Sequence, residues 1–213
     1  MTEKFLPNSE LWKEYKPTAR GAQEYLEDFG LTLKDLRGKK ILDIGSGLNE
    51  FANDLRDENL DITSIDPFYG LSKEEQEELY KNGYEDGEER LTELLDKLKS
   101  GNRSSKLVAG RSEDMPFASG SFDLVISHYG LPFYAEDGEK LKQFFLELSR
   151  ILNEGGEAKL YPSYIKSDTD ETTELSREKI EVFENILKEL EDQEFEVDRT
   201  NNNIILRKPK TNT

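Results

Sequence analysis

The chain has 213 residues, a formal net charge of -17, one histidine and no cysteine. This acidity argues against nucleic-acid or anionic-membrane partners, which bind patches of Lys and Arg. The lack of cysteine excludes disulfides, thiolate nucleophiles and cysteine zinc sites, and one histidine excludes a histidine-cluster metal site. The sequence shows no signal peptide and no apolar run of transmembrane length. We therefore expect a single cytoplasmic domain over residues 1–213, with no membrane span and no bound metal.

Residues 1–38 are expected to form a helical lead-in to the first strand. Apolar side chains at helical spacing predict a helix that ends at about Phe29, and Gly30 is a suitable stop. Two interpretations of this helix stay open. It packs on the edge of a sheet, or it forms a flap over a bound ligand, with Tyr15 or Arg20 touching that ligand.

The first strand and the glycine turn after it are the most informative stretch. Residues 41–44 suit a buried parallel strand, residues 45–47 read Gly-Ser-Gly, and a helix is expected over residues 49–56. This is the first half of a nucleotide-binding βαβ unit. A pyrophosphate site has a third glycine where this chain has Glu50, and both Glu50 and Asp43 would repel pyrophosphate. S-adenosylmethionine, with an adenosine, an amino group and a sulfonium, tolerates both acids; a turn that merely permits tight packing is the alternative.

A second strand is expected over residues 60–66, and Pro67 closes it. Asp66 stands 19 positions after Gly47. An acid about 20 residues beyond the glycine turn, at the tip of the second strand, is placed to accept hydrogen bonds from ribose hydroxyls; an ordinary strand-ending Asp is the alternative. Residues 69–104 are very polar and are expected to form a helical insertion. It is a lid or substrate-recognition element, or merely a solvated helix.

The rest of the chain continues the alternation of strands and helices that is typical of an α/β fold. Strands are expected at residues 106–109, 122–128, 157–161, 195–197 and 204–207, and helices at 91–98, 141–152 and 173–192, the second of them stopped by residues 153–156. The fourth strand ends at Ser127 and His128. The aromatic loop that follows, residues 129–134, either forms the wall of a substrate pocket or belongs to the core.

Three blocks of the chain, in order, carry a resemblance to a known family. They are residues 41–47, residues 113–127 and residues 148–156. The pattern resembles the class I S-adenosylmethionine-dependent methyltransferases, and within them the small-molecule branch typified by ubiquinone and menaquinone biosynthesis. The resemblance implies an α/β, Rossmann-like fold with a seven-stranded, mostly parallel sheet, an antiparallel last strand and helices on both faces. It also implies S-adenosyl-L-methionine as cofactor, S-adenosyl-L-homocysteine as product and a small-molecule acceptor.

The resemblance also assigns roles to individual residues. The residues expected to bind the cofactor are Asp43, Gly45, Ser46, Gly47, Asp66, Pro67, Arg111, Ser112, Glu113 and Ser127. By the family pattern the two glycines admit the methionine part, Asp43 supports that part, and Asp66 holds the ribose. Arg111 departs from the pattern, because the family often has an acid there that meets the adenine amino group.

His128 and Tyr129 are candidates for catalysis, because the activated methyl group should lie where the fourth strand ends. An unperturbed histidine is poised near neutral pH to act as a base, and the alternative is that His128 packs or hydrogen-bonds at the strand end. Methyl transfer from a sulfonium needs mainly in-line positioning and desolvation. We therefore expect a methyltransferase acting on a small molecule. A weak or inactive S-adenosylmethionine-binding module and an NAD-type oxidoreductase are the alternatives, and Glu50 counts against the second; the oligomeric state stays open.

Overall fold

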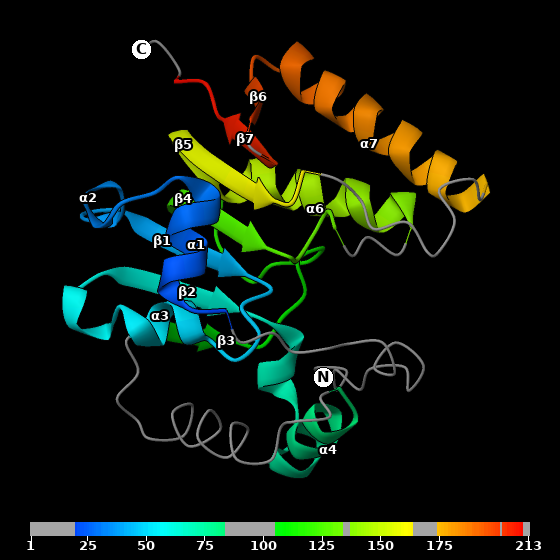
Figure 1. Cartoon of the computed structure of the whole chain (residues 1–213). Helices are drawn as coiled ribbons and strands as arrows, with labels where there is room; N and C mark the ends of the chain where they lie inside the picture. The colour runs from blue at the N-terminus through cyan, green and yellow to red at the C-terminus, as the bar shows by residue number, and fades with distance from the viewer. Residues whose placement is uncertain (1–19, 84–104, 134–136, 164–173, 201, 211–213) are drawn as a thin grey trace.

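The computed structural model describes residues 20–83, 105–133, 137–163, 174–200 and 202–210. The strands are β1 (Lys40–Ile44), β2 (Asp61–Ile65), β3 (Ser105–Val108), β4 (Phe122–His128), β5 (Leu152–Tyr161), β6 (Glu196–Thr200) and β7 (Asn203–Arg207). They form one seven-stranded sheet in the order β3-β2-β1-β4-β5-β7-β6 (Figure 1). Strands β1 to β5 pair in parallel, whereas β7 is antiparallel to β5 and β6. This confirms the expected mostly parallel sheet with an antiparallel last strand.

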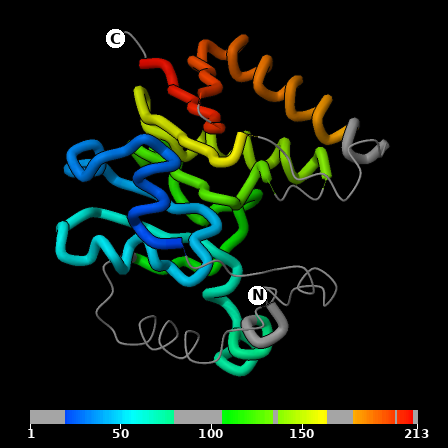
Figure 2. Tube along the Cα trace, viewed as in Figure 1, coloured from blue at the N-terminus to red at the C-terminus, as the bar shows by residue number. Residues whose placement is uncertain are grey.

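Helices cover both faces of the sheet, as expected. They are α1 (Ala22–Phe29), α2 (Leu33–Leu36), α3 (Glu50–Asp54), α4 (Lys73–Gly83), α6 (Gly138–Ile151) and α7 (Glu174–Asp192), with short 3-10 helices η2 (Arg56–Glu58) and η3 (Pro67–Gly70). Figure 1 shows α1 in front of the sheet and α6 behind it, and the chain trace in Figure 2 follows the same layers. Among the described residues, no helix is long and apolar enough to cross a membrane.

Each helix layer encloses its own apolar cluster against the sheet. Successive side chains of a strand point to opposite faces, so Leu42 and Ile44 pack with the residues of α6 and α7, and Ile41 packs with those of α1 and α3. A strand buried on both faces reads as a nearly continuous apolar run, which is why residues 41–44 were recognisable. Asp43 is the polar exception, and it is fully buried.

The start of β5 differs from the prediction. Residues 153–156 were expected to stop the helix and to precede a strand at 157. The helix α6 does end there, at Ile151, but β5 begins at once with Leu152. Residues 153–156 interrupt its pairing with β4, because Leu152 pairs with Phe122 and the next pair is Glu157 with Leu124. The backbone of this segment pairs with the chain beyond β7: Gly155 donates to the Lys208 carbonyl, and the Lys208 amide donates to Gly156, both at 3.0 Å. The helix expected over residues 49–56 is also shorter, since α3 is followed by η2. The helix expected at residues 91–98 lies outside the described residues.

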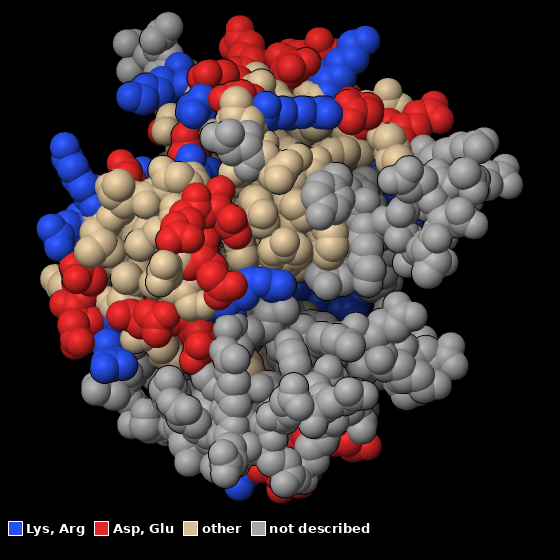
Figure 3. Space-filling model, in the orientation of Figure 1, with Lys and Arg blue, Asp and Glu red and all other residues tan. Residues whose placement is uncertain are grey.

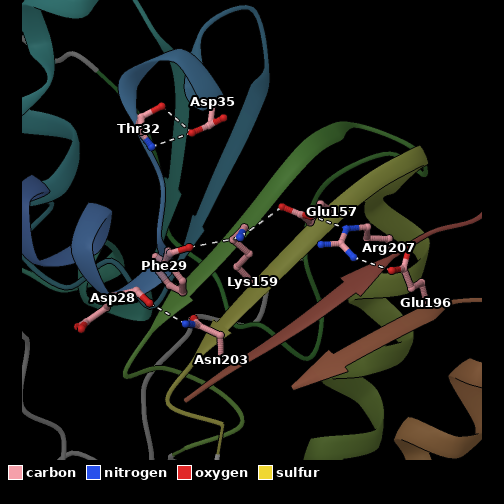
Figure 4. Close-up of polar contacts among 9 residues, drawn as sticks. All are labelled: Asp28, Phe29, Thr32, Asp35, Glu157, Lys159, Glu196, Asn203 and Arg207. Carbon is pink, nitrogen blue, oxygen red and sulfur yellow. Dashed lines mark hydrogen bonds and ion pairs between the residues drawn. The ribbon is translucent and has the colours of Figure 1, made fainter. Parts of the chain in front are cut away.

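Side chains from the sheet fasten the carboxyl end of α1 (Figure 4). Gly30 adopts the left-handed conformation at φ 60°, which confirms it as the helix stop. The Lys159 ammonium of β5 donates to the Phe29 carbonyl at 3.3 Å, and the Asn203 amide of β7 donates to the Asp28 carbonyl at 2.6 Å. A cation beside the last carbonyls of a helix complements the helix dipole. The end of α1 is therefore held in place over the sheet.

The charged residues are spread unevenly over the face that carries α1. In Figure 3, Asp and Glu side chains lie in the middle of this face and also along its upper and left edges, where most of the visible Lys and Arg side chains lie among them. This distribution agrees with the net charge of -17.

Candidate functional site

The glycine turn lies at the carboxyl edge of the sheet, where ligands of open α/β folds bind. Gly45 and Gly47 have φ values of 71° and 52°, a left-handed backbone that glycine adopts without a Cβ penalty. The Gly45 amide donates to the carbonyl of Ile65, the last residue of β2, at 2.9 Å. The turn thus links the ends of β1 and β2. Because its two glycines have no Cβ, a ligand can approach the backbone of the turn closely.

Asp66 joins the glycine turn to the start of η3. Its Oδ2 accepts from the Gly47 amide at 2.9 Å and its Oδ1 accepts from the Phe68 amide at 2.8 Å. The side chain is buried. A carboxylate has about four acceptor positions, so these two bonds are compatible with the expected bonds from ribose hydroxyls. Asp66 has a structural role in addition to any ligand contact.

Asp43 is a buried carboxyl with one of its oxygens unpaired. Its Oδ1 accepts from the Tyr25 hydroxyl of α1 at 3.3 Å. Within the described residues, Oδ2 has no hydrogen-bond partner. Burial raises the pKa of Asp43 to about 8, the nearby Asp66 charge adds to the rise, and the Tyr25 hydrogen bond opposes it. A buried polar atom without a partner and a strongly shifted pKa both point to a functional site.

Arg20 lies over the loop that follows β4. Its guanidinium carbon is 4.0 Å from the centroid of the Tyr129 ring, a cation–π distance. Its Nη1 is buried and has no hydrogen-bond partner in the part of the chain that the structure describes. The same loop touches the glycine turn, since a Cβ added to Gly45 would lie 3.4 Å from the Gly130 Cα. Arg20 and Tyr129 are therefore close neighbours of the turn.

The loop expected beside the adenine is held on α6 by two charged side chains. Glu147 accepts from the Met115 amide at 2.7 Å, and Arg150 donates to the carbonyls of Phe117 and Met115 at 2.6 and 3.0 Å. Arg150 also pairs with Glu147 at 2.7 Å. These contacts join the second and third sequence blocks directly. Arg150 therefore has a structural role, because it fastens this loop to α6.

The residues expected to contact the adenine lie in and beside this loop. Arg111, Ser112 and Glu113 are half-buried, and the Ser112 hydroxyl donates to Glu113 at 3.0 Å. Pro67 opens η3 directly after Asp66. The structure thus brings all three parts of the predicted cofactor site to one edge of the sheet, while their contacts with the cofactor stay predictions.

His128 ends β4 and is almost fully buried, with 1% of its surface exposed. Its Nε2 lies 2.7 Å from Oδ2 of Asp28 on α1. Its ring lies between Tyr25, at a centroid distance of 4.5 Å, and Tyr161, at 5.1 Å and 10° from parallel. Burial lowers the pKa of His128, against the opposing effect of Asp28. The structure supports the packing interpretation of His128 without testing a role as base.

Several residues of this region carry no local signal in the sequence. Tyr25 and Asp28 belong to an amphipathic helix, so the sequence pattern indicates only that Tyr25 is a core residue and Asp28 a surface residue. Tyr69 exchanges a hydrogen bond of 2.7 Å with Ser46 across the turn. The Oγ of Ser127 is buried, and among the described residues nothing hydrogen-bonds to it; a Cβ added to Gly130 would clash with it. Only the position of Gly130 just after a strand marked it as a site of close approach.

Residues 42–159 match the family described as methyltransferase domain. The chain belongs to this family. S-adenosyl-L-methionine is therefore the methyl donor, S-adenosyl-L-homocysteine the product, and the protein an S-adenosylmethionine-dependent methyltransferase. No curated protein matches the chain.

Solved structures show the same fold. One is a protein from Methanococcus maripaludis assigned as an S-adenosyl-L-methionine-dependent methyltransferase, with 20% identity, 90% of this chain and 84% of that chain covered, and a TM-score of 0.51. Another is the N-methyltransferase NodS from Bradyrhizobium japonicum, with 15% identity, coverages of 88% and 96%, and a TM-score of 0.53. At these identities the likeness concerns the fold.

Proposed function

We propose that this methyltransferase acts on a small molecule and holds its cofactor between the glycine turn and the amino end of α1. Asp43 Oδ2 and Arg20 Nη1 carry this proposal: both are buried and neither has a hydrogen-bond partner within the described residues. The methionine end of the cofactor carries an ammonium and a carboxylate, which complement the two atoms. An unpaired buried polar atom costs about 1–3 kcal/mol, and the ligand would satisfy both.

The remaining cofactor contacts follow the same edge of the sheet. We assign the ribose to Asp66, the border of the adenine to Pro67, and the adenine itself to the loop at residues 111–113. Ser46 and Ser127 lie at the ends of β1 and β4, beside the methionine part. The arrangement of these residues at one edge supports the assignment.

We place the methyl acceptor at the end of β4, near His128 and Tyr129. When bound, the cofactor supplies a sulfonium methyl group that is already activated, so the protein mainly positions the acceptor and excludes water. A role of His128 as base, a ubiquinone-like acceptor, a single domain over residues 1–213 and a cytoplasmic location stay predictions from the sequence.

The cofactor assignment is tested by calorimetric titration of the purified protein with S-adenosylhomocysteine. Arg20→Ala and Asp66→Ala should each lose at least about tenfold in affinity, since charge-assisted hydrogen bonds contribute about 1.5–3 kcal/mol. Arg37→Ala and Asp61→Ala are matched controls, because these side chains are exposed. Circular dichroism of each variant checks that it is folded. Unchanged affinity in Arg20→Ala would contradict the placement of the methionine carboxylate.

A catalytically weak module that binds the cofactor would use the same contacts, so binding alone does not separate the two functions. A measurement of turnover separates them. The parent protein should convert S-adenosylmethionine to S-adenosylhomocysteine faster with a suitable small molecule than without one. Equal slow conversion with every compound of a panel of hydroxyl, amine and carbon acids would favour the module.

A further inference from the structure

Asp28 and His128 form a hydrogen-bonded pair at the end of β4, where the methyl acceptor is proposed to bind; the ring is buried and the carboxylate is half-buried. The carboxylate oxygen and the ring Nε2 are 2.7 Å apart, and 35% of the Asp28 side chain is exposed. An ionised carboxylate only accepts hydrogen bonds, so Nε2 carries the proton of the neutral ring and Nδ1 carries a lone pair. Nδ1 is buried, and no described residue hydrogen-bonds to it. A proton acceptor thus stands unused where the methyl acceptor is expected.

The position of Asp28 is set by residues far away in the chain. Asn203 of β7 holds the Asp28 carbonyl at 2.6 Å, and Lys159 of β5 holds the next carbonyl, that of Phe29, at 3.3 Å (Figure 4). The backbone that carries the Asp28 carboxylate is therefore fixed relative to the sheet. A structural cap of the helix would need only the two contacts with the carbonyls.

Aromatic rings surround His128 and prevent it from turning. Tyr25 and Tyr161 lie against its faces, and Phe29 and Tyr129 contact it edge-on at centroid distances of 5.5 and 5.2 Å. Tyr129 and Tyr161 are half-buried, whereas Tyr25 and Phe29 are buried. Half-buried Phe133 packs edge-on against Tyr129 at 5.3 Å. His128 is thus enclosed by aromatic rings, and half-buried Tyr129 and Tyr161 are the most exposed of them. A planar aromatic acceptor suits such surroundings, because aromatic rings pack well against one another.

We propose that Asp28 is a positioning residue that holds His128 with Nδ1 free to take the proton of an aromatic hydroxyl acceptor. This inference rests on the proposed function, and it names the class of acceptor. Because His128 is buried, the acceptor displaces the side chains that pack on the Tyr129 side of the imidazole ring. Its oxygen forms a bond to the methyl carbon, the electron pair of the carbon–sulfur bond goes to sulfur, and the hydroxyl proton goes to Nδ1. The positive charge passes from the sulfonium to the imidazolium, which Asp28 stabilises.

The charges around His128 suit this role. Burial and Arg20 lower the pKa of His128, while the hydrogen bond to Asp28 and the charges of Asp28 and Glu24 raise it; the net shift is downward. The ring is therefore neutral near pH 7 and able to accept a proton. Three phenol rings also face it, those of Tyr25, Tyr129 and Tyr161.

The proposal is tested by nitrogen-15 NMR of the imidazole, which is unambiguous because the chain has one histidine. In the complex with S-adenosylhomocysteine, Nε2 should be protonated and Nδ1 should not. Titration with phenol should shift the Nδ1 signal, and anisole, which has no hydroxyl proton, should not. A protonated Nδ1 at pH 7, or an Nδ1 signal that phenol leaves in place, would overturn the proposal.

Two variants separate positioning from mere packing. Asp28→Ala should lose the preference for the Nε2-protonated ring and lower the histidine pKa, because the charge that raises it is gone; Asp28→Glu should restore both in part. Glu27→Ala is the matched control, since this exposed carboxylate on the same helix pairs with Gln23 instead. An unchanged ring in Asp28→Ala would also overturn the proposal. The titration with S-adenosylhomocysteine that precedes each spectrum reports separately on the proposed function, because a parent protein that does not bind it contradicts that function first.

Discussion

Replacing Asp43 with asparagine is expected to stabilise the protein at high pH while it weakens cofactor binding. Burial, with a smaller contribution from Asp66, raises the pKa of Asp43 from 3.8 to about 8 in the folded protein, and the bond from Tyr25 opposes the rise. The folded state therefore binds more protons than the unfolded state between about pH 4 and pH 8. The stability due to this group is complete below the unfolded pKa and is lost as the pH rises through the folded pKa.

The size of the effect follows from the pKa difference. The pKa rises from 3.8 to about 8. At 1.36 kcal/mol per unit, a shift of about 4 units corresponds to about 6 kcal/mol. Relaxation of the protein and entry of water reduce the penalty of a buried charge, so we expect about 2–4 kcal/mol. Asparagine has nearly the same shape and no charge, so the variant should not show this loss.

Urea denaturation at about pH 5, 7 and 9 measures the difference directly. The unfolding free energy of Asp43→Asn minus that of the parent should increase with pH, because all other groups titrate alike in both proteins. Asp61→Asn is the control, since that exposed side chain begins β2. A difference that stays constant over this range would mean that Asp43 is ionised throughout, and the reasoning from its burial would be wrong.

Other measurements test how the site is held together. Binding of S-adenosylhomocysteine should release a proton below about pH 8, because its ammonium favours ionised Asp43; calorimetry in two buffers of different ionisation heat detects it, and equal heats would contradict it. Tyr25→Phe should weaken the same binding a few-fold and raise the pKa of Asp43, measured as a shift of the proton-release curve. Arg150→Ala should lower the unfolding free energy, measured by urea denaturation, by about 2 kcal/mol, because the carbonyls of Phe117 and Met115 lose a charged donor. Replacement of the exposed Lys142 by alanine should change it by less than about 0.5 kcal/mol. Gly130→Ala should lower the melting temperature and abolish binding, because the added Cβ clashes with the Ser127 side chain. Binding close to that of the parent would show that the loop shifts to accommodate the Cβ.

The elements with strong local patterns were predicted closely from the sequence. Strand β4 has the predicted bounds, Phe122–His128, because an apolar run bounded by a glycine turn is a local signal. Gly30 stops α1 for the same reason, since the left-handed conformation suits glycine. Residues 153–156 end the helix as predicted, and Gly155 has the left-handed conformation that a turn needs. Their inclusion in β5 was not predicted, because two glycines in sequence indicate a turn. Their backbone is paired by Lys208, which is more than fifty residues away, and no local pattern carries that information.

The candidate site divides in the same way. The sequence alone determined that a glycine turn follows β1 and that an acid stands at the tip of β2, because spacing along the chain sets both. Only the tertiary structure decided that Tyr25 bonds to Asp43, 18 positions away, and that Asp28 faces His128, 100 positions away. Such contacts depend on how α1 lies across the sheet. That placement comes from apolar packing and from side chains on β5 and β7, which short-range patterns do not encode.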